Sequence, residues 1–134
     1  MSEAWFSEIE STILTNLSYM LTERQDAPFP NLVVTSTNQN QVTAFPTLYI
    51  HELTPVEAGN DLNNQTINAV LETIEIQIWT NDTEAECRQL MSAAIVEMKR
   101  MRFNCTAFPN IQTDNKIAFG IARFRRMIGS GDTL

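Results

Sequence analysis

The sequence is poor in the residues from which most catalytic and metal sites are built. It has one histidine, His51, and two cysteines, Cys87 and Cys105, in 134 residues. It contains no C-x-x-C, H-x-x-x-H or G-x-S-x-G motif and no glycine-rich phosphate-binding pattern. A histidine-based metal site or catalytic triad would therefore depend on His51 alone. We expect two buried free thiols, no metal, no cofactor and no enzymatic activity.

Long hydrophobic runs are absent as well. No apolar stretch approaches the roughly 20 residues that are needed to span a bilayer. The N-terminal segment MSEAWFSEIE is acidic, whereas a signal peptide begins with a basic region. These absences predict a protein that has no membrane segment and is cytosolic where it is made.

Positive charge is scarce and unevenly distributed. Nine Lys and Arg stand against sixteen Asp and Glu, which gives a net charge of −7 and argues against a free-standing nucleic-acid binder. The cations that follow residue 98 are seven of the nine, namely Lys99, Arg100, Arg102, Lys116, Arg123, Arg125 and Arg126. This polarity could serve complementarity between subunits. The clustering of cations is explained equally well if these side chains are simply solvated at the end of a helix and on a strand.

The segment from Ala69 to Met101 changes its apolar period from two to near 3.6. Ile74, Ile76 and Ile78 alternate with polar residues and Trp79, which predicts a strand with one buried face. Thr83 and Glu86 then form a capping box that starts a helix. The apolar face of this helix comprises Cys87, Leu90, Met91, Ala94, Met98 and Met101. We expect the helix to fold back onto the isoleucine face of its own strand and to form the core.

The residues before this segment predict a helix and two extended stretches. The helix is capped by Ser2 and runs to about Glu23, where the following prolines end it. Its apolar stripe comprises Trp5, Phe6, Ile9, Ile13, Leu17 and Met20. A short strand or arm beginning near Leu32 comes next, and then a strand from Pro46 to Leu53 with Tyr49 and His51 on one side. Residues 54–68 are rich in Pro, Gly, Asn and Asp and predict a mobile connection.

After the second helix the pattern predicts two more strands. Residues 105–111 form a weak strand that contains Pro109, and residues 112–116 form a polar turn. Residues 117–128 form a long strand whose second half is cationic. The whole chain thus predicts a single α+β domain over residues 1–128, with an antiparallel or mixed sheet of about four to five strands packed against two helices. Residues 129–134 are expected to form a frayed tail.

A pair of neighbouring carboxylates can form a catalytic site. Glu72 and Glu75 lie close together on the central strand. Because side chains alternate between the two faces of a strand, these two carboxylates point to opposite faces and cannot serve one reacting atom. Function is therefore expected in surfaces rather than in a pocket.

The order of these elements resembles that of a known family. An N-terminal helix is followed by FPTLYIHEL, by the strand ETIEIQIWTND, by the helix TEAECRQLMSAAIVEMKRM and by the closing IAFGIARFRRMIGSGD. Over about residues 1–132 this order resembles the tail terminator, or tail-completion and head–tail joining, proteins of long-tailed bacteriophages.

The resemblance implies a virion structural protein that acts at the head–tail junction and is assembled in the host cytoplasm. Such proteins form a ring, typically of six subunits, that caps the tail tube, stops its polymerisation and meets the head connector. DNA would pass through the lumen without specific binding, and an acidic ring would not trap it. The resemblance places subunit or partner contacts in the arm of residues 33–42, the loop 56–68 and the strand 123–126. The candidate residues are Val33, Val34, Val42, Val56, Asp61, Leu62, Arg123, Arg125 and Arg126.

Three alternatives remain open from the sequence. The chain could be another head–tail connector component, such as an adaptor or a stopper. It could instead be a small ligand-binding or regulatory domain whose pocket uses the faces of Tyr49, His51 and Trp79. The arginines of the last strand could be ordinary edge-strand charges that discourage aggregation.

Overall fold

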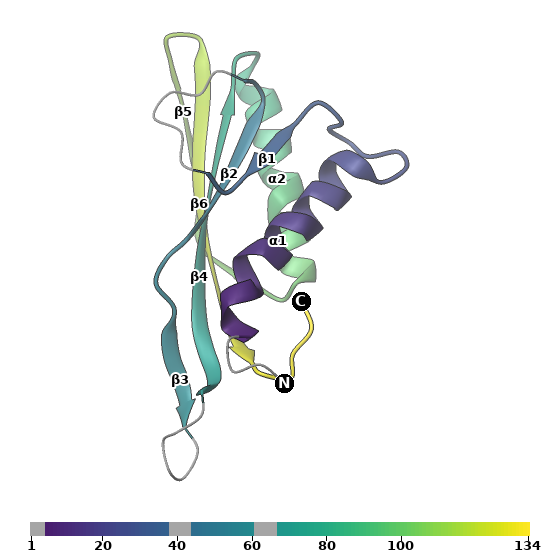
Figure 1. Ribbon diagram of the computed structural model, residues 1–134. Helices are drawn as coiled ribbons and strands as arrows, with labels where there is room; N and C mark the ends of the chain where they lie inside the picture. Colours follow the sequence, from purple (N-terminus) through teal and green to yellow (C-terminus); the bar gives the residue numbers. More distant parts are fainter. Residues whose placement is uncertain (1–4, 38–43, 61–66) are drawn as a thin grey trace.

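The computed structural model describes residues 5–37, 44–60 and 67–134. Its centre is a mixed six-stranded sheet in the order β1-β2-β4-β6-β5, with β3 also paired to β4. The strands are β1 (Val33–Thr35), β2 (Thr47–Glu52), β3 (Val56–Asn60), β4 (Ile67–Thr80), β5 (Asn104–Asp114) and β6 (Ile117–Gly129). Two α-helices, α1 (Ile9–Ser18) and α2 (Glu84–Arg100), pack on the same face of the sheet (Figure 1). The predicted α+β class is confirmed.

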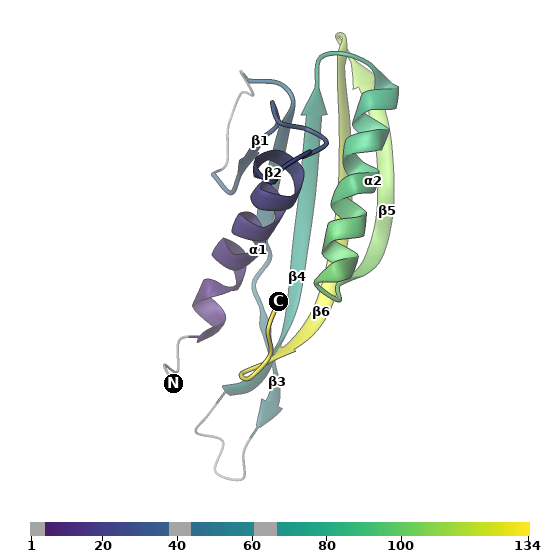
Figure 2. The same cartoon turned by 90° about the vertical axis from the view of Figure 1, so that its right-hand side faces the viewer.

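The predicted pairing of strand β4 with helix α2 is confirmed. The Thr83 side chain accepts a hydrogen bond from the Glu86 amide at 3.1 Å, as a capping box requires. The six predicted apolar positions of the helix and the three isoleucines of β4 are all buried. Figure 2 shows α2 lying along β4 and β6, so the helix does return over its own strand.

The first helical segment consists of three successive parts. A 3-10 turn η1 (Trp5–Glu8) leads into α1, and a π-helical turn η2 (Tyr19–Glu23) follows it. The predicted stripe is buried at Ile9, Ile13 and Leu17, but its next fully buried residue is Leu21 rather than Met20. The wider π-helical turn brings a later residue onto the packed face. The predicted cap Ser2 lies outside the described residues.

The connection predicted for residues 54–68 is partly a strand. β3 lies within it, and β4 begins at Ile67. The pairing of β3 with β4 is interrupted between Glu57 and Gly59 and between Gly59 and Asn60. The residues of β3 have weak strand propensity, so the strand depends on its pairing with β4, which the local sequence does not reveal.

The polar turn predicted for residues 112–116 is shorter than expected. β5 extends to Asp114, and only Asn115 and Lys116, with φ of 51° and 66°, form the turn to β6. Two successive residues with positive φ are typical of the tight turn that joins twisted antiparallel strands.

The strand order places β5, but not β6, at an edge of the sheet. Pro109 is tolerated because β5 is an edge strand. β6 lies between β4 and β5, so its arginines are not on an edge strand.

Small residues of β6 let α2 approach the sheet. Ala118, Gly120 and Ala122 face the helices, whereas Ile117, Phe119 and Ile121 lie half-buried on the opposite face. A Cβ atom at Gly120 would lie only 3.1 Å from Cγ1 of Ile111 and 3.3 Å from Cε of Met91. The close contact of α2 therefore depends on the absence of a side chain at this position.

The C-terminal residues 129–134, which were expected to be frayed, form a turn against the fold. The Gly129 amide donates to Oδ2 of Asp132 at 2.8 Å, and the Ser130 amide donates to the Asn68 carbonyl at 3.0 Å. Leu134 packs against the core. Among the described residues, no helix is long and apolar enough to cross a membrane.

Candidate functional site

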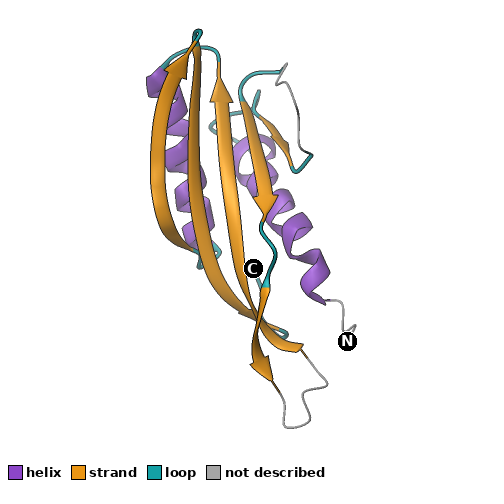
Figure 3. Cartoon of the chain, turned by 90° about the vertical axis from the view of Figure 1, so that its left-hand side faces the viewer, coloured by secondary structure: helices purple, strands orange, loops and turns teal. Residues whose placement is uncertain are grey.

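The candidate site is the face of the sheet that is turned away from the helices, called here the helix-free face. Figure 3 shows this face, with both helices behind the strands. Strand register decides which side chains it carries. Tyr49 pairs with Gln77, which pairs with Ile121, and His51 pairs with Glu75. Since directly paired residues share a face, the odd-numbered residues of β2, β4 and β6 lie on the helix-free face.

One end of the helix-free face is aromatic. The ring centroids of Trp79 and Phe119, which are register partners, lie 4.9 Å apart. The rings of Tyr49 and His51 stack at 5.9 Å, and the Tyr49 hydroxyl lies 3.2 Å from Nδ1 of His51. Burial raises the pKa of Tyr49, and the negative charges of Glu10 and Glu75 raise it further.

The middle of the helix-free face carries a band of charge. Nε of Arg123 donates to Oε2 of Glu75 at 3.0 Å, and the Gln77 amide donates to the other Glu75 oxygen. Arg125, on the next exposed position of β6, pairs with Thr73 and Asn104 in the register. Both oxygens of the Glu75 carboxylate thus accept hydrogen bonds from neighbours on the same face.

The other end of the helix-free face is apolar. Val56 of β3 pairs with Leu71 of β4, which pairs with Met127 of β6, so the three side chains form one row. Val56 is 60% exposed and Met127 is 59% exposed. β3 and the start of β4 extend beyond the helices at this end of the molecule (Figure 1).

The structure places four of the predicted interface residues on the helix-free face. Arg123, Arg125 and Val56 lie there, and Val33 joins them because it pairs with Thr47 of β2. They do not form one patch, since Val33 is at the β1 edge and Val56 is at the opposite end. Val34 faces the helices and packs against the core. Val42, Asp61 and Leu62 lie outside the described residues.

Arg126 is an exception among the predicted interface arginines because it faces the helices. It is only 7% exposed. One guanidinium nitrogen donates to the Met101 carbonyl at 3.0 Å, and another lies 3.5 Å from Oδ2 of Asp132. Arg126 therefore joins the end of α2 to the C-terminal turn, and in this structure it does not present its charge to a partner.

The prediction that Glu72 and Glu75 point to opposite faces is confirmed. Glu75 is on the helix-free face, whereas Glu72 lies under the helices and is fully buried. Sequence analysis missed the carboxyl that does lie near Glu72, which is that of Glu52 on β2. Its position depends on the pairing of β2 with β4, in which Glu52 stands opposite Ile74.

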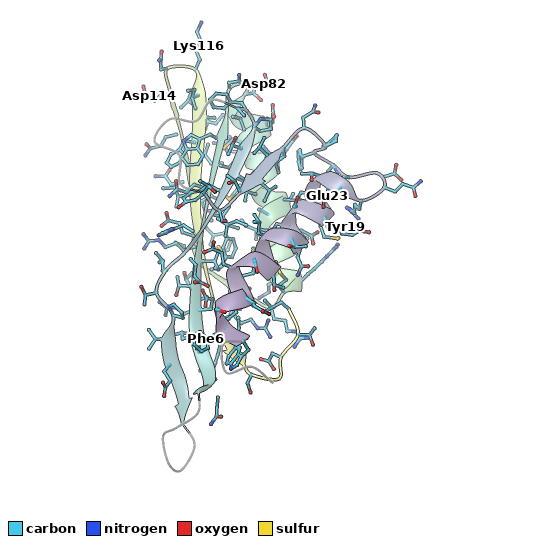
Figure 4. The ribbon with its side chains drawn as sticks, viewed as in Figure 1. Phe6, Tyr19, Glu23, Asp82, Asp114 and Lys116 are labelled. Atoms are coloured by element: carbon cyan, nitrogen blue, oxygen red, sulfur yellow. The ribbon has the colours of Figure 1, made fainter. Side chains whose placement is uncertain are left out.

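Charged side chains also gather at the turns that follow β4 and β5. Figure 4 shows Asp82, Asp114 and Lys116 at this end of the molecule. The Thr113 hydroxyl donates to Oε2 of Glu84 at 3.3 Å and joins the β5–β6 hairpin to the start of α2.

The two cysteines differ in burial. Burial raises the pKa of the Cys87 thiol to about 11, and the charges of Glu84 and Glu86 add to this effect, so this thiol stays protonated near neutral pH. Cys105 is only half-buried, which differs from the expected burial of both thiols.

Leu134 contributes to the lining of two hollows that the described residues form on the helix side. One, of about 240 Å³, lies between the ends of the two helical segments and includes Tyr19 and Arg100. The other, of about 260 Å³, includes Trp5 and Asp132. Within the described ranges, no group of three or more His, Cys, Asp or Glu is arranged to hold a metal ion.

A comparison of the sequence with models of known protein families gives no match, and a search of curated proteins finds no similar sequence.

Proposed function

We propose that this protein is a virion structural protein of a long-tailed bacteriophage, which forms a ring at the head-proximal end of the tail tube. In this role it ends tail polymerisation and joins the tail to the head connector. The observation that carries the proposal is the helix-free face, a broad surface with an aromatic end, a charged band and an apolar end. A second copy of the chain, the tail tube protein and the connector protein are the proposed partners, and six copies form the ring.

The apolar row at the end of this face supports a protein partner. Val56 and Met127 each expose more than half of their surface, and Leu71 lies between them. Adjacent exposed apolar side chains with polar neighbours are typical of protein–protein contacts. The nearby exposed cation Arg125 adds a charged rim that can select the orientation of an acidic partner.

The net charge of the chain is compatible with a ring through which DNA passes. Of the cations after residue 98, Arg100, Arg123 and Arg126 pair with Glu97, Glu75 and Asp132 of the same chain. A protein with a net charge of −7 repels a polyanion on average, so DNA would move through the lumen without specific binding.

An adaptor or stopper of the head–tail connector is the second candidate. It would use the same face for the same kind of ring contact, and only its neighbours in the virion would differ. Tyr49 and His51 stack on this face, which keeps a small ligand-binding domain as a third, more distant candidate.

The proposal is tested by adding the purified protein to polymerising tail-tube subunits and measuring tube length by negative-stain microscopy. We expect short tubes with ring-shaped density at one end, and the mean length should fall as more protein is added. An acidic globular protein of similar mass serves as the control. Tubes of unchanged length and without end density would contradict the terminator role. Binding to connector rings alone would favour the adaptor or stopper.

A further inference from the structure

The buried face of β4 contains one acidic side chain among apolar ones. Val70, Glu72 and Ile74 follow one another on the face that packs under the helices. Glu72 is 0% exposed, and in the described part of the chain no hydrogen-bond donor reaches its carboxyl oxygens apart from the carboxyl of Glu52. A buried carboxylate without a donor is strongly disfavoured, so the charge state of Glu72 requires an explanation.

The neighbour of Glu72 is a second carboxyl, that of Glu52 on β2. One Glu52 oxygen is likewise buried without a partner. Two carboxyls can bond to each other only if one of them keeps its proton. Burial raises the pKa of Glu72 to about 9, and the hydrogen bond with Glu52 and the charges of Glu52 and Glu10 add to this effect. Burial also raises the pKa of Glu52, although the bond with Glu72 and the nearby His51 lower it in part.

The cation that could neutralise Glu72 is close but is occupied elsewhere. Arg126 of β6 is the direct register partner of Glu72. Its guanidinium is bound to the Met101 carbonyl and to Asp132 of the C-terminal turn. Burial lowers the pKa of Arg126, Asp132 raises it, and Arg102, from the turn after α2, lowers it. Arg126 is thus the register partner of one buried acid, Glu72, and the ion-pair partner of another acid, Asp132.

We propose that Glu72 and Glu52 share one proton in the folded protein, and that loss of this proton draws Arg126 from Asp132 to Glu72 and releases the C-terminal turn. The proton leaves to solvent, and the new negative charge on Glu72 is compensated by the guanidinium directly opposite. Asp132 then loses its cation while it still accepts from the Gly129 amide. The turn lines the hollow that includes Trp5 and Asp132, so its release reshapes that surface.

The test is a pH titration followed by two-dimensional amide NMR on the full chain. In the wild type, the amide signals of Gly129 and Ser130 should shift together in a single step at a pH several units above the usual range of a glutamic acid. Glu72→Gln keeps the shape of the side chain and cannot ionise, so this step should disappear. Asp132→Asn removes the negative charge that pairs with Arg126, so it should also abolish the step while leaving the titration of Glu72 itself.

Glu23→Gln, at an exposed position of η2, is the matched control and should leave the step unchanged. The titration of Glu72 is measured separately from the carbon-13 signal of its carboxyl. Titration of this carboxyl near pH 4.5 would overturn the shared proton. If the Glu72 carboxyl titrates at high pH but the amide signals of Gly129 and Ser130 do not shift, the transfer of Arg126 from Asp132 to Glu72 is overturned. Neither measurement depends on the proposed role in a virion.

Discussion

At the scale of single residues, the buried carboxyl of Glu72 makes stability depend on pH. Its pKa is about 9 in the folded protein against 4.5 for an unperturbed glutamic acid. The folded state therefore holds this proton more tightly than the unfolded state. The stabilisation is complete below pH 4.5, decreases as pH rises between these two values and is lost above the higher one. The slope can reach about 1.4 kcal/mol per pH unit.

Urea unfolding at pH 6 and pH 9 measures this dependence. We expect the wild type to lose more stability between these two pH values than Glu72→Gln, because the glutamine has no proton to lose. Glu23→Gln should behave like the wild type. Equal losses in the wild type and in Glu72→Gln would show that the carboxyl is not the cause.

Gly120 is a second residue on which packing depends. Valine there would extend toward Ile111 and Met91, which already lie within 3.3 Å of the position of a Cβ atom. We expect Gly120→Val to lower the free energy of unfolding by about 1–3 kcal/mol through overpacking. Gly131→Val is the control, since nothing lies within 4 Å of its Cβ position. Urea unfolding of both variants compares them, and equal stabilities would contradict the tight contact of α2.

The face of the sheet on which a side chain lies was predictable only where the sequence alternates between apolar and polar residues. The alternation of Ile74, Ile76 and Ile78 with polar residues predicts their burial correctly. The cationic end of β6 gave no such indication for Arg126, because neighbouring arginines stand on both faces. Its burial depends on the register with Glu72 and on the position of Asp132, which are set by the assembled sheet.

At the scale of elements, α2 depends on its N-terminal cap. The Thr83 hydroxyl accepts from the Glu86 amide, which otherwise has no intrahelical partner. We expect Thr83→Ala to cost about 1 kcal/mol of stability, measured by urea unfolding. Ser92→Ala, on the exposed side of the same helix, is the control and should be neutral or slightly stabilising. A loss at Ser92 as large as that at Thr83 would argue against a specific cap.

The elements with strong local signals were those that the sequence predicted. The capping box and the 3.6-residue period of α2 lie within one short segment, so no distant contact is needed to recognise them. β3 was missed because VEAGN has little strand propensity, and its pairing with residues 67–71 of β4 supplies the stabilisation. For the same reason, the polar end of β5 was predicted as part of a turn.

At the scale of the whole molecule, the candidate site is a product of sheet assembly. Because side chains alternate along a strand, Tyr49 and His51 share one face of β2, and Trp79 and Glu75 share one face of β4. Only the register between β2 and β4 brings both pairs onto the same face of the sheet. The apolar row of Val56, Leu71 and Met127 joins three strands and has no counterpart in the linear sequence. The sequence therefore predicts the class of fold and some members of the site, whereas the site as a surface requires the structure.

The central claim is that the helix-free face makes the contacts of a tail-terminating ring. It is tested by measuring tail-tube length with two matched variants, Met127→Glu on this face and Val96→Glu on the outer side of α2. Their side chains are 59% and 50% exposed, so neither substitution should unfold the protein. We predict that wild type and Val96→Glu give short capped tubes and that Met127→Glu leaves tubes long. Short tubes with Met127→Glu, or long tubes with both variants, would contradict the account.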